Sequence, residues 1–166
     1  TAASAGAMNA AAMVTGLERG GSAGARQALD VLWHEVNQSG GRNVFGHSGA
    51  WLKTLTPTWM TDNPVWQASQ TLAMSMSPYS FNPFNLNPLQ RVIEASVDFE
   101  ALRASKVRIH VSATAVKAGQ SRIFGNSEMA AEVLLASACL PHMFQAVEIE
   151  GEAYWDGGYL ANPALW

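Results

Sequence analysis

Hydrophobic residues recur along this chain with two different spacings, one typical of helices and one typical of strands. Residues 22–36 carry apolar side chains at every third or fourth position, which predicts an amphipathic helix. Its apolar stripe consists of Ala25, Leu29, Leu32, Trp33 and Val36. An alanine- and methionine-rich run over 5–18 predicts an earlier helix, and Gly20-Gly21 separates the two, with Ser22 as the expected N-cap. From residue 107 to 114 apolar and polar residues alternate, which is typical of a strand.

The remaining elements follow from turn signals. We expect irregular chain over 40–64, a helix over 65–76, a loop over 77–88 and a helix from 88 to 95. A second strand over 121–124 and a helix over 128–139 come next. A hairpin then turns at Glu150-Gly151, and its second strand leads to Asp156. Because helices and strands interleave, the fold class is α/β, in one domain over residues 1–166.

The composition limits the kinds of partner that the protein is expected to bind. The chain has 166 residues, a net charge of −3 and 14% charged residues, with no basic run that would bind nucleic acid. Its lone cysteine, Cys139, excludes an internal disulfide and is expected to be a small buried residue. We expect no metal and no cofactor. Neither a secretory signal nor a long apolar span is present, which favours a cytoplasmic location.

Three serines are candidates for a nucleophile. Ser22 fits the pattern G-x-S-x-G, but a helix precedes it where that motif needs a strand, so capping is the better interpretation. Ser48, in Gly46-His47-Ser48-Gly49, lacks the second glycine at the right spacing. Ser4 has Ala2 in place of the first glycine, yet Ala5 and Gly6 are small and a helix follows at once. Local chemistry alone leaves Ser4 open between a nucleophile and a simple helix cap.

The motifs at the two ends of the chain together resemble the patatin-like phospholipase family. The similarity rests on residues 4–10 (SAGAMNA), on 136–151 (ASACLPHMFQAVEIEG) and on Asp156-Gly157-Gly158, followed by Asn162 and Pro163. It implies a three-layer α/β/α fold, here incomplete at the N-terminal side, where the first strand and the glycine-rich oxyanion loop would lie. We therefore expect a piece of a longer protein that is weak or inactive by itself.

The resemblance implies a serine acyl hydrolase that cleaves lipid acyl esters through an acyl-enzyme. Carried onto this sequence, Ser4 is the nucleophile, Asp156 the base, Ala5 and Gly6 form the elbow and oxyanion side, and Gly157 and Gly158 form the turn after the base. A Ser–Asp–His triad is the rival mechanism, but all four histidines precede Asp156. Because Ala2 departs from the motif, a non-catalytic lipid-binding or interaction protein is the alternative function.

The expected substrate is a lipid or another acyl ester, which needs an apolar groove. Methionines and tryptophans are candidates for its lining or, alternatively, for the core: Met8, Met13, Trp51, Trp59, Met60, Trp66, Met74 and Met76. The tryptophan-bearing segment over 40–66 suits a lid or a peripheral membrane contact. The sequence does not separate hydrolysis from acyl transfer, since both pass through the same acyl-enzyme.

Overall fold

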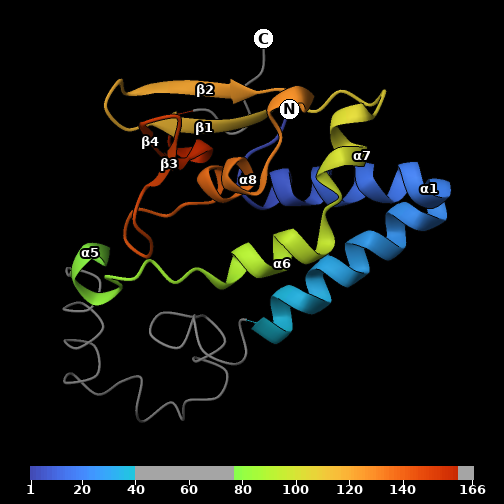
Figure 1. Cartoon of the computed structure of the whole chain (residues 1–166), viewed down its shortest axis with the longest axis horizontal. Coiled ribbons are helices and arrows are strands. Elements are labelled where there is room, and N and C mark those ends of the chain that lie inside the picture. Colours follow the sequence, from blue (N-terminus) through green and yellow to red (C-terminus); the bar gives the residue numbers. More distant parts are fainter. Residues whose placement is uncertain (40–76, 161–166) are drawn as a thin grey trace.

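The computed structural model describes residues 1–39 and 77–160 (Figure 1). Its helices are α1 (Ala5–Ser39), α5 (Pro78–Phe81), α6 (Pro88–Ser96), α7 (Phe99–Ala104) and α8 (Ala131–Ser137). Its strands are β1 (Val111–Ala115), β2 (Gln120–Phe124), β3 (Val147–Ile149) and β4 (Glu152–Asp156), and two short 3-10 turns are η2 (Asn126–Glu128) and η3 (Gly157–Tyr159). The mixture of helices and sheet confirms the predicted α/β class.

The four strands form one antiparallel sheet in the order β2-β1-β4-β3. All five residues of β1 are buried, so the predicted alternation of buried and exposed positions is wrong there. The reason is its central place: β1 pairs with β2 on one edge and with β4 on the other, and α8 packs against it. A strand covered in this way needs small or apolar residues throughout. Its sequence, VSATA, meets that need with small side chains.

Helix α1 is two helices joined by a kink, as the sequence predicts. Gly20 and Gly21 leave the helical conformation, and Gly21 has a φ of 58°, a backbone region that favours glycine. The two halves fold back on each other so closely that a Cβ added at Gly16 would overlap the Gly24 carbonyl oxygen, and one at Gly24 would overlap that of Gly16. This pair of glycines therefore sets how closely the halves of α1 pack.

The helices gather beneath the sheet, with α8 next to it and α6 packed between α8 and α1 (Figure 1). Their buried side chains and those of the strands form one hydrophobic core. The largest fully buried apolar members are Leu32, Ile93, Leu102, Met129 and Leu134. Helix α8 contacts both the sheet and the other helices, so it joins the two parts of the core.

Most local predictions match the structure within a few residues. The proline-initiated helix is α6, the hairpin at Glu150-Gly151 joins β3 to β4, and the second strand is β2. The helix over 128–139 is shorter than predicted, because the Glu128 carboxylate accepts the Gly125 N–H and ends a separate turn, η2. The loop over 77–88 contains α5, and α7 was not predicted. The expectations for 40–76, Ser48 included, lie outside the described residues. Among the helices that the structure does describe, none is long and apolar enough to cross a membrane.

Candidate active site

Ser4 lies on a sharp turn between an extended segment and a helix. Ala2 forms a parallel bridge with Val111, through hydrogen bonds of 2.8 Å to the His110 carbonyl and 3.0 Å from the Ser112 N–H. Helix α1 begins directly after the serine. Ser4 itself has a φ of 52°, which is uncommon for a residue with a side chain. This is the strand–turn–helix geometry that projects a serine hydroxyl from a nucleophile elbow.

Alanine at position 2 fits this turn. The elbow requires small side chains because the chain before the serine passes close to the first turn of the helix. A Cβ added at Gly6 would lie 3.8 Å from the Ala2 Cβ, which is ordinary van der Waals contact. The departure from the motif at position 2 therefore introduces no steric conflict, since Gly6 leaves room for the alanine methyl group.

Asp156 ends β4 and caps the turn η3. Its side chain is buried, with 4% exposed, and its Oδ1 accepts the Gly158 N–H at 2.6 Å. Gly157 faces the backbone of Ser112 so closely that an added Cβ would overlap the Ser112 carbonyl oxygen. The two glycines after the aspartate thus have separate functions: Gly157 permits close contact with β1, and Gly158 supplies a donor that orients the carboxylate.

The two ends of the chain meet along one edge of β1. Asp156 pairs with Ala113, and Ala2 continues the same edge opposite Val111, two residues further along β1. At about 3.3 Å per strand residue, the two partner positions are roughly 6.6 Å apart. Ser4 is two residues from Ala2, so the fold brings the segments that carry the predicted nucleophile and the predicted base to the same edge of β1.

A second pair of hydrogen bonds fixes both residues to the end of α8. The Ser4 N–H is shared between the Ser137 carbonyl at 3.1 Å and the Ser137 hydroxyl at 3.0 Å. The Asp156 N–H donates to the Cys139 carbonyl at 2.8 Å. Ser137 is fully buried and was not singled out by the sequence analysis. Its signal was a hydroxyl in the otherwise apolar run LLASACL.

The hydrogen bonds of the described residues leave the reacting groups without partners. None joins the Ser4 hydroxyl to the Asp156 carboxylate, and Asp156 Oδ2 accepts none. The Ala5 N–H, at the start of α1, likewise donates to no described residue. Catalytic hydrogen bonds are often longer without substrate, so this geometry leaves the predicted roles open.

An open apolar cavity of about 690 Å³ borders the turn at Ser4 through Ala2, Ala3 and Gly6, although neither Ser4 nor Asp156 lines it. Its wall runs from Ala2 and Gly6 along one face of α1 to Met13 and Trp33. Asn9 adds a polar group that accepts the Trp33 indole N–H at 2.8 Å. Of the residues predicted for an acyl groove, Met13 lies in this wall, whereas Met8 is in the core.

The competing candidates sit elsewhere in the described part of the chain. Ser22 is exposed directly after the kink of α1, where a helix and not a strand precedes it. His34, His110 and His142 are exposed, and none is hydrogen-bonded to Ser4; His34 instead contacts Gln38.

Cys139 is buried, as predicted. Burial, together with the nearby Asp156 carboxylate, raises the pKa of its thiol to about 11. The thiol is therefore protonated at neutral pH, and its Sγ donates to the Gln145 carbonyl at 3.1 Å. We find in it a structural donor and no nucleophile.

The turn at Ser4, the turn after Asp156 and the α/β fold are the features on which the predicted family rests. Comparison with known families gives the second step: the model of the patatin-like phospholipase family matches residues 1–165, and the chain belongs to this family. The predicted family is thereby confirmed, and with it the coarse assignment to hydrolases of lipid metabolism. A search of curated proteins and a search of solved structures returned no match.

Proposed function

We propose that this protein is a serine acyl hydrolase that cleaves acyl esters of lipids with Ser4 as nucleophile and Asp156 as base. The observation that carries the proposal is the backbone of Ser4, a non-glycine residue with a φ of 52° between an extended segment and α1, in a patatin-like phospholipase. Such a conformation costs about 1–2 kcal/mol for an L-residue other than glycine or asparagine. A serine kept there at that cost has a use for its hydroxyl.

In the proposed reaction the Ser4 Oγ attacks the ester carbonyl carbon, and its proton passes to Asp156 Oδ2. The Ala5 N–H, which has no partner among the described residues, donates to the oxyanion that forms. The proton on Asp156 then leaves with the alcohol as the C–O bond breaks. Water then gives a proton to the same carboxylate and attacks the acyl carbon. That proton passes to Ser4 Oγ as its bond to the acyl carbon breaks, which releases the fatty acid and restores the serine hydroxyl.

The surroundings of each group support these roles. The Gly158 N–H holds Asp156 Oδ1 at 2.6 Å, which leaves Oδ2 as the proton acceptor. The cavity beside the elbow has a volume of about 690 Å³, within the roughly 300–1,000 Å³ of small-molecule sites, and is mainly apolar. We assign it to the acyl chain of the substrate.

The test is turnover of p-nitrophenyl butyrate and of phosphatidylcholine by Ser4→Ala and Asp156→Asn variants of the full-length protein. We expect Ser4→Ala to lower kcat at least a thousandfold, because it removes the nucleophile, and Asp156→Asn to lower it about 10²–10⁴-fold. Thermal unfolding checks that both variants fold.

Ser22→Ala is the matched control, because Ser22 fits the formal motif but lies after a helix. It should keep full turnover, and a fluorophosphonate should label Ser4 alone. Turnover retained by Ser4→Ala would exclude the proposal. Binding of phosphatidylcholine without any turnover or labelling of the wild-type protein would favour the non-catalytic alternative.

A further inference from the structure

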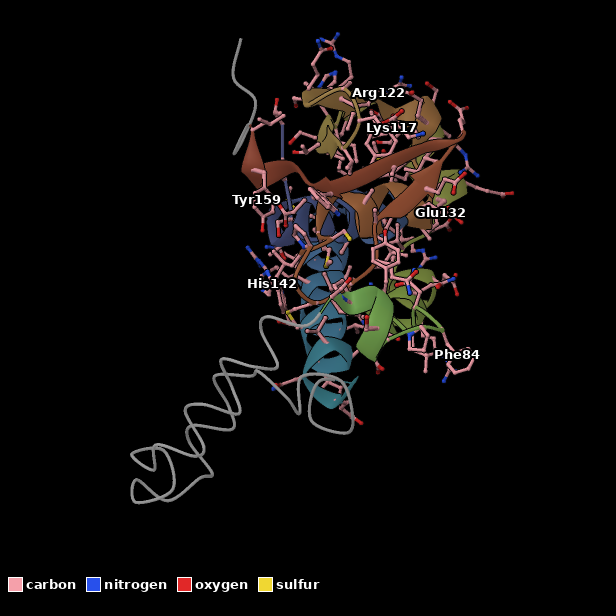
Figure 2. All side chains as sticks on the ribbon, turned by 90° about the vertical axis from the view of Figure 1, so that its left-hand side faces the viewer. Phe84, Lys117, Arg122, Glu132, His142 and Tyr159 are labelled. Carbon is pink, nitrogen blue, oxygen red and sulfur yellow. The ribbon has the colours of Figure 1, made fainter. Side chains whose placement is uncertain are left out.

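An exposed apolar tip lies between α5 and α6. We call residues 82–86 (NPFNL) the Phe84 tip. Phe84 is 84% exposed and Leu86 is 71% exposed, the highest values among the large hydrophobic residues of the described chain. Figure 2 shows the Phe84 side chain pointing outward from the ribbon. Large apolar groups exposed side by side mark a surface that contacts something else.

The tip is held in a defined conformation by the Asn82 amide. Asn82 Oδ1 accepts the Leu86 N–H at 2.9 Å, and its Nδ2 donates to the Leu86 carbonyl at 3.2 Å. The Asn85 N–H closes the turn onto the Asn82 carbonyl at 3.0 Å, with Asn85 at a φ of 48°. Phe84 and Leu86 are thus presented to solvent by a closed turn, so little further ordering is needed when they bind.

The tip is fixed to the loop that supports the candidate base. Gln145 Nε2 donates to the Asn82 carbonyl at 2.8 Å, and the Gln145 carbonyl accepts the Cys139 thiol at 3.1 Å. The Cys139 carbonyl in turn accepts the Asp156 N–H. In Figure 1, α5 lies at the lower left, whereas α1 begins in the middle of the molecule, beside α8. The tip is therefore joined to the loop before Asp156 through Gln145, at a distance from the turn at Ser4.

The chemistry of the tip favours a lipid surface over a protein. No residue from 77 to 90 is charged, so insertion desolvates only amides, hydroxyls and apolar groups. A phenylalanine buries about 150–250 Å², so two side chains fall well short of the roughly 800 Å² per partner of a stable protein interface. Two inserted apolar side chains do suffice for weak, reversible membrane binding.

We propose that the Phe84 tip is an interfacial anchor that inserts Phe84 and Leu86 into a lipid surface. This inference rests on the proposed function, in that the lipid surface would contain the substrate. It assigns the membrane contact to the described residues 82–86. The sequence analysis had placed such a contact in the segment over 40–66.

The experiment measures binding to phosphatidylcholine vesicles by sedimentation, for Phe84→Ser and Leu86→Ser proteins. We expect each substitution to lower the partition coefficient about tenfold, because each removes one inserted apolar side chain. Raising the salt from about 0.1 M to 0.5 M should leave binding unchanged, because no charged residue takes part. Turnover of soluble p-nitrophenyl butyrate should stay at the wild-type level, whereas turnover of vesicle phospholipid should fall with binding.

Val107→Ser is the matched control, since Val107 is also exposed, at 42%, and lies before β1 away from the tip. It should bind vesicles like the wild type. Wild-type binding by Phe84→Ser and Leu86→Ser would overturn the anchor. The anchor would also be overturned if the two variants bound vesicles like the wild type but had a smaller mass than the wild type in sedimentation equilibrium. That result would mean that the tip mediates association between protein molecules. Binding that depends on the tip in a protein without esterase activity would keep the anchor and reject the proposed function.

Discussion

Ser4 and Asn85 adopt nearly the same left-handed backbone, with φ values of 52° and 48°, in very different surroundings. Asparagine tolerates this conformation well, and Asn85 sits in an exposed turn closed by the neighbouring Asn82 amide. Serine tolerates it less well, and Ser4 is held by Ser137, 133 residues away. The comparison shows that a left-handed turn costs little where the residue suits it. Where the residue does not suit it, contacts from distant elements must impose it.

The largest effect should come from disturbing those distant contacts. Gly157→Ala places a methyl group against the Ser112 carbonyl, on the strand residue whose N–H holds Ala2. We expect a loss of about 1–3 kcal/mol in the free energy of unfolding, together with lower esterase turnover, because both ends of the site shift. Urea denaturation and the soluble-ester assay measure the two effects.

Gly125→Ala is the control for that substitution. Gly125 has an ordinary φ of −90° and open space where a Cβ would lie, so the same added methyl group should change little. Equal losses for the two variants would mean that the contact of Gly157 with Ser112 does not explain the effect.

Intermediate effects are expected for glycine substitutions at Ser4 and Asn85, which compare the two left-handed turns directly. Ser4→Gly should raise the free energy of unfolding by about 1 kcal/mol, because glycine relieves the left-handed conformation, and should abolish turnover. Asn85→Gly should change stability by only a few tenths of a kcal/mol, because asparagine already suits its turn. Urea denaturation compares them, and equal changes would remove the distinction drawn between Ser4 and Asn85.

The smallest effect on stability should come from altering an exposed polar contact, like those that close the Phe84 tip. Asp98 caps α7 by accepting the Ala101 N–H at 3.0 Å and pairs with Arg19 at 3.0 Å, and these bonds lower the pKa of its carboxyl group. A lowered folded-state pKa stabilises the protein above the unfolded value near 3.8, and this is lost as the pH falls through the folded-state pKa.

Asp98→Asn keeps a good cap and removes only the charge. At pH 7 we expect a slight loss of stability, measured by thermal unfolding, that diminishes as the pH falls below the unfolded value near 3.8 and the wild-type carboxylate is protonated. A difference that persists undiminished in acid would show that the charge is not its source.

The elements that could be predicted from the sequence are those marked by local residues. Gly20-Gly21, Pro88 and Glu150-Gly151 mark the kink of α1, the start of α6 and the β3–β4 hairpin. Helix α7 was not predicted, because six residues are too few to show a helical period. The full burial of β1 was not predicted, because it depends on β4 and α8, which come later in the chain.

The candidate site was predictable as a pair of motifs and not as a geometry. Ser4 and Asp156 came from the family resemblance, and their roles stay predictions. The bond from the Ser4 N–H to Ser137 and the contact of Gly157 with Ser112 join residues far apart in the sequence. A single sequence carries no signal for such pairs beyond the residue types themselves.

The contact between Gly16 and Gly24 bears on the order in which this molecule assembles. It joins residues eight positions apart, so the two halves of α1 can close on each other with a small loss of chain entropy. The bond that shapes the elbow must instead bring Ser4 to Ser137 across most of the chain. Local contacts form quickly and long-range ones slowly. We therefore expect the halves of α1 to close early, with a relaxed serine at the start of the helix, and the left-handed turn to be imposed on Ser4 only when α8 packs in place.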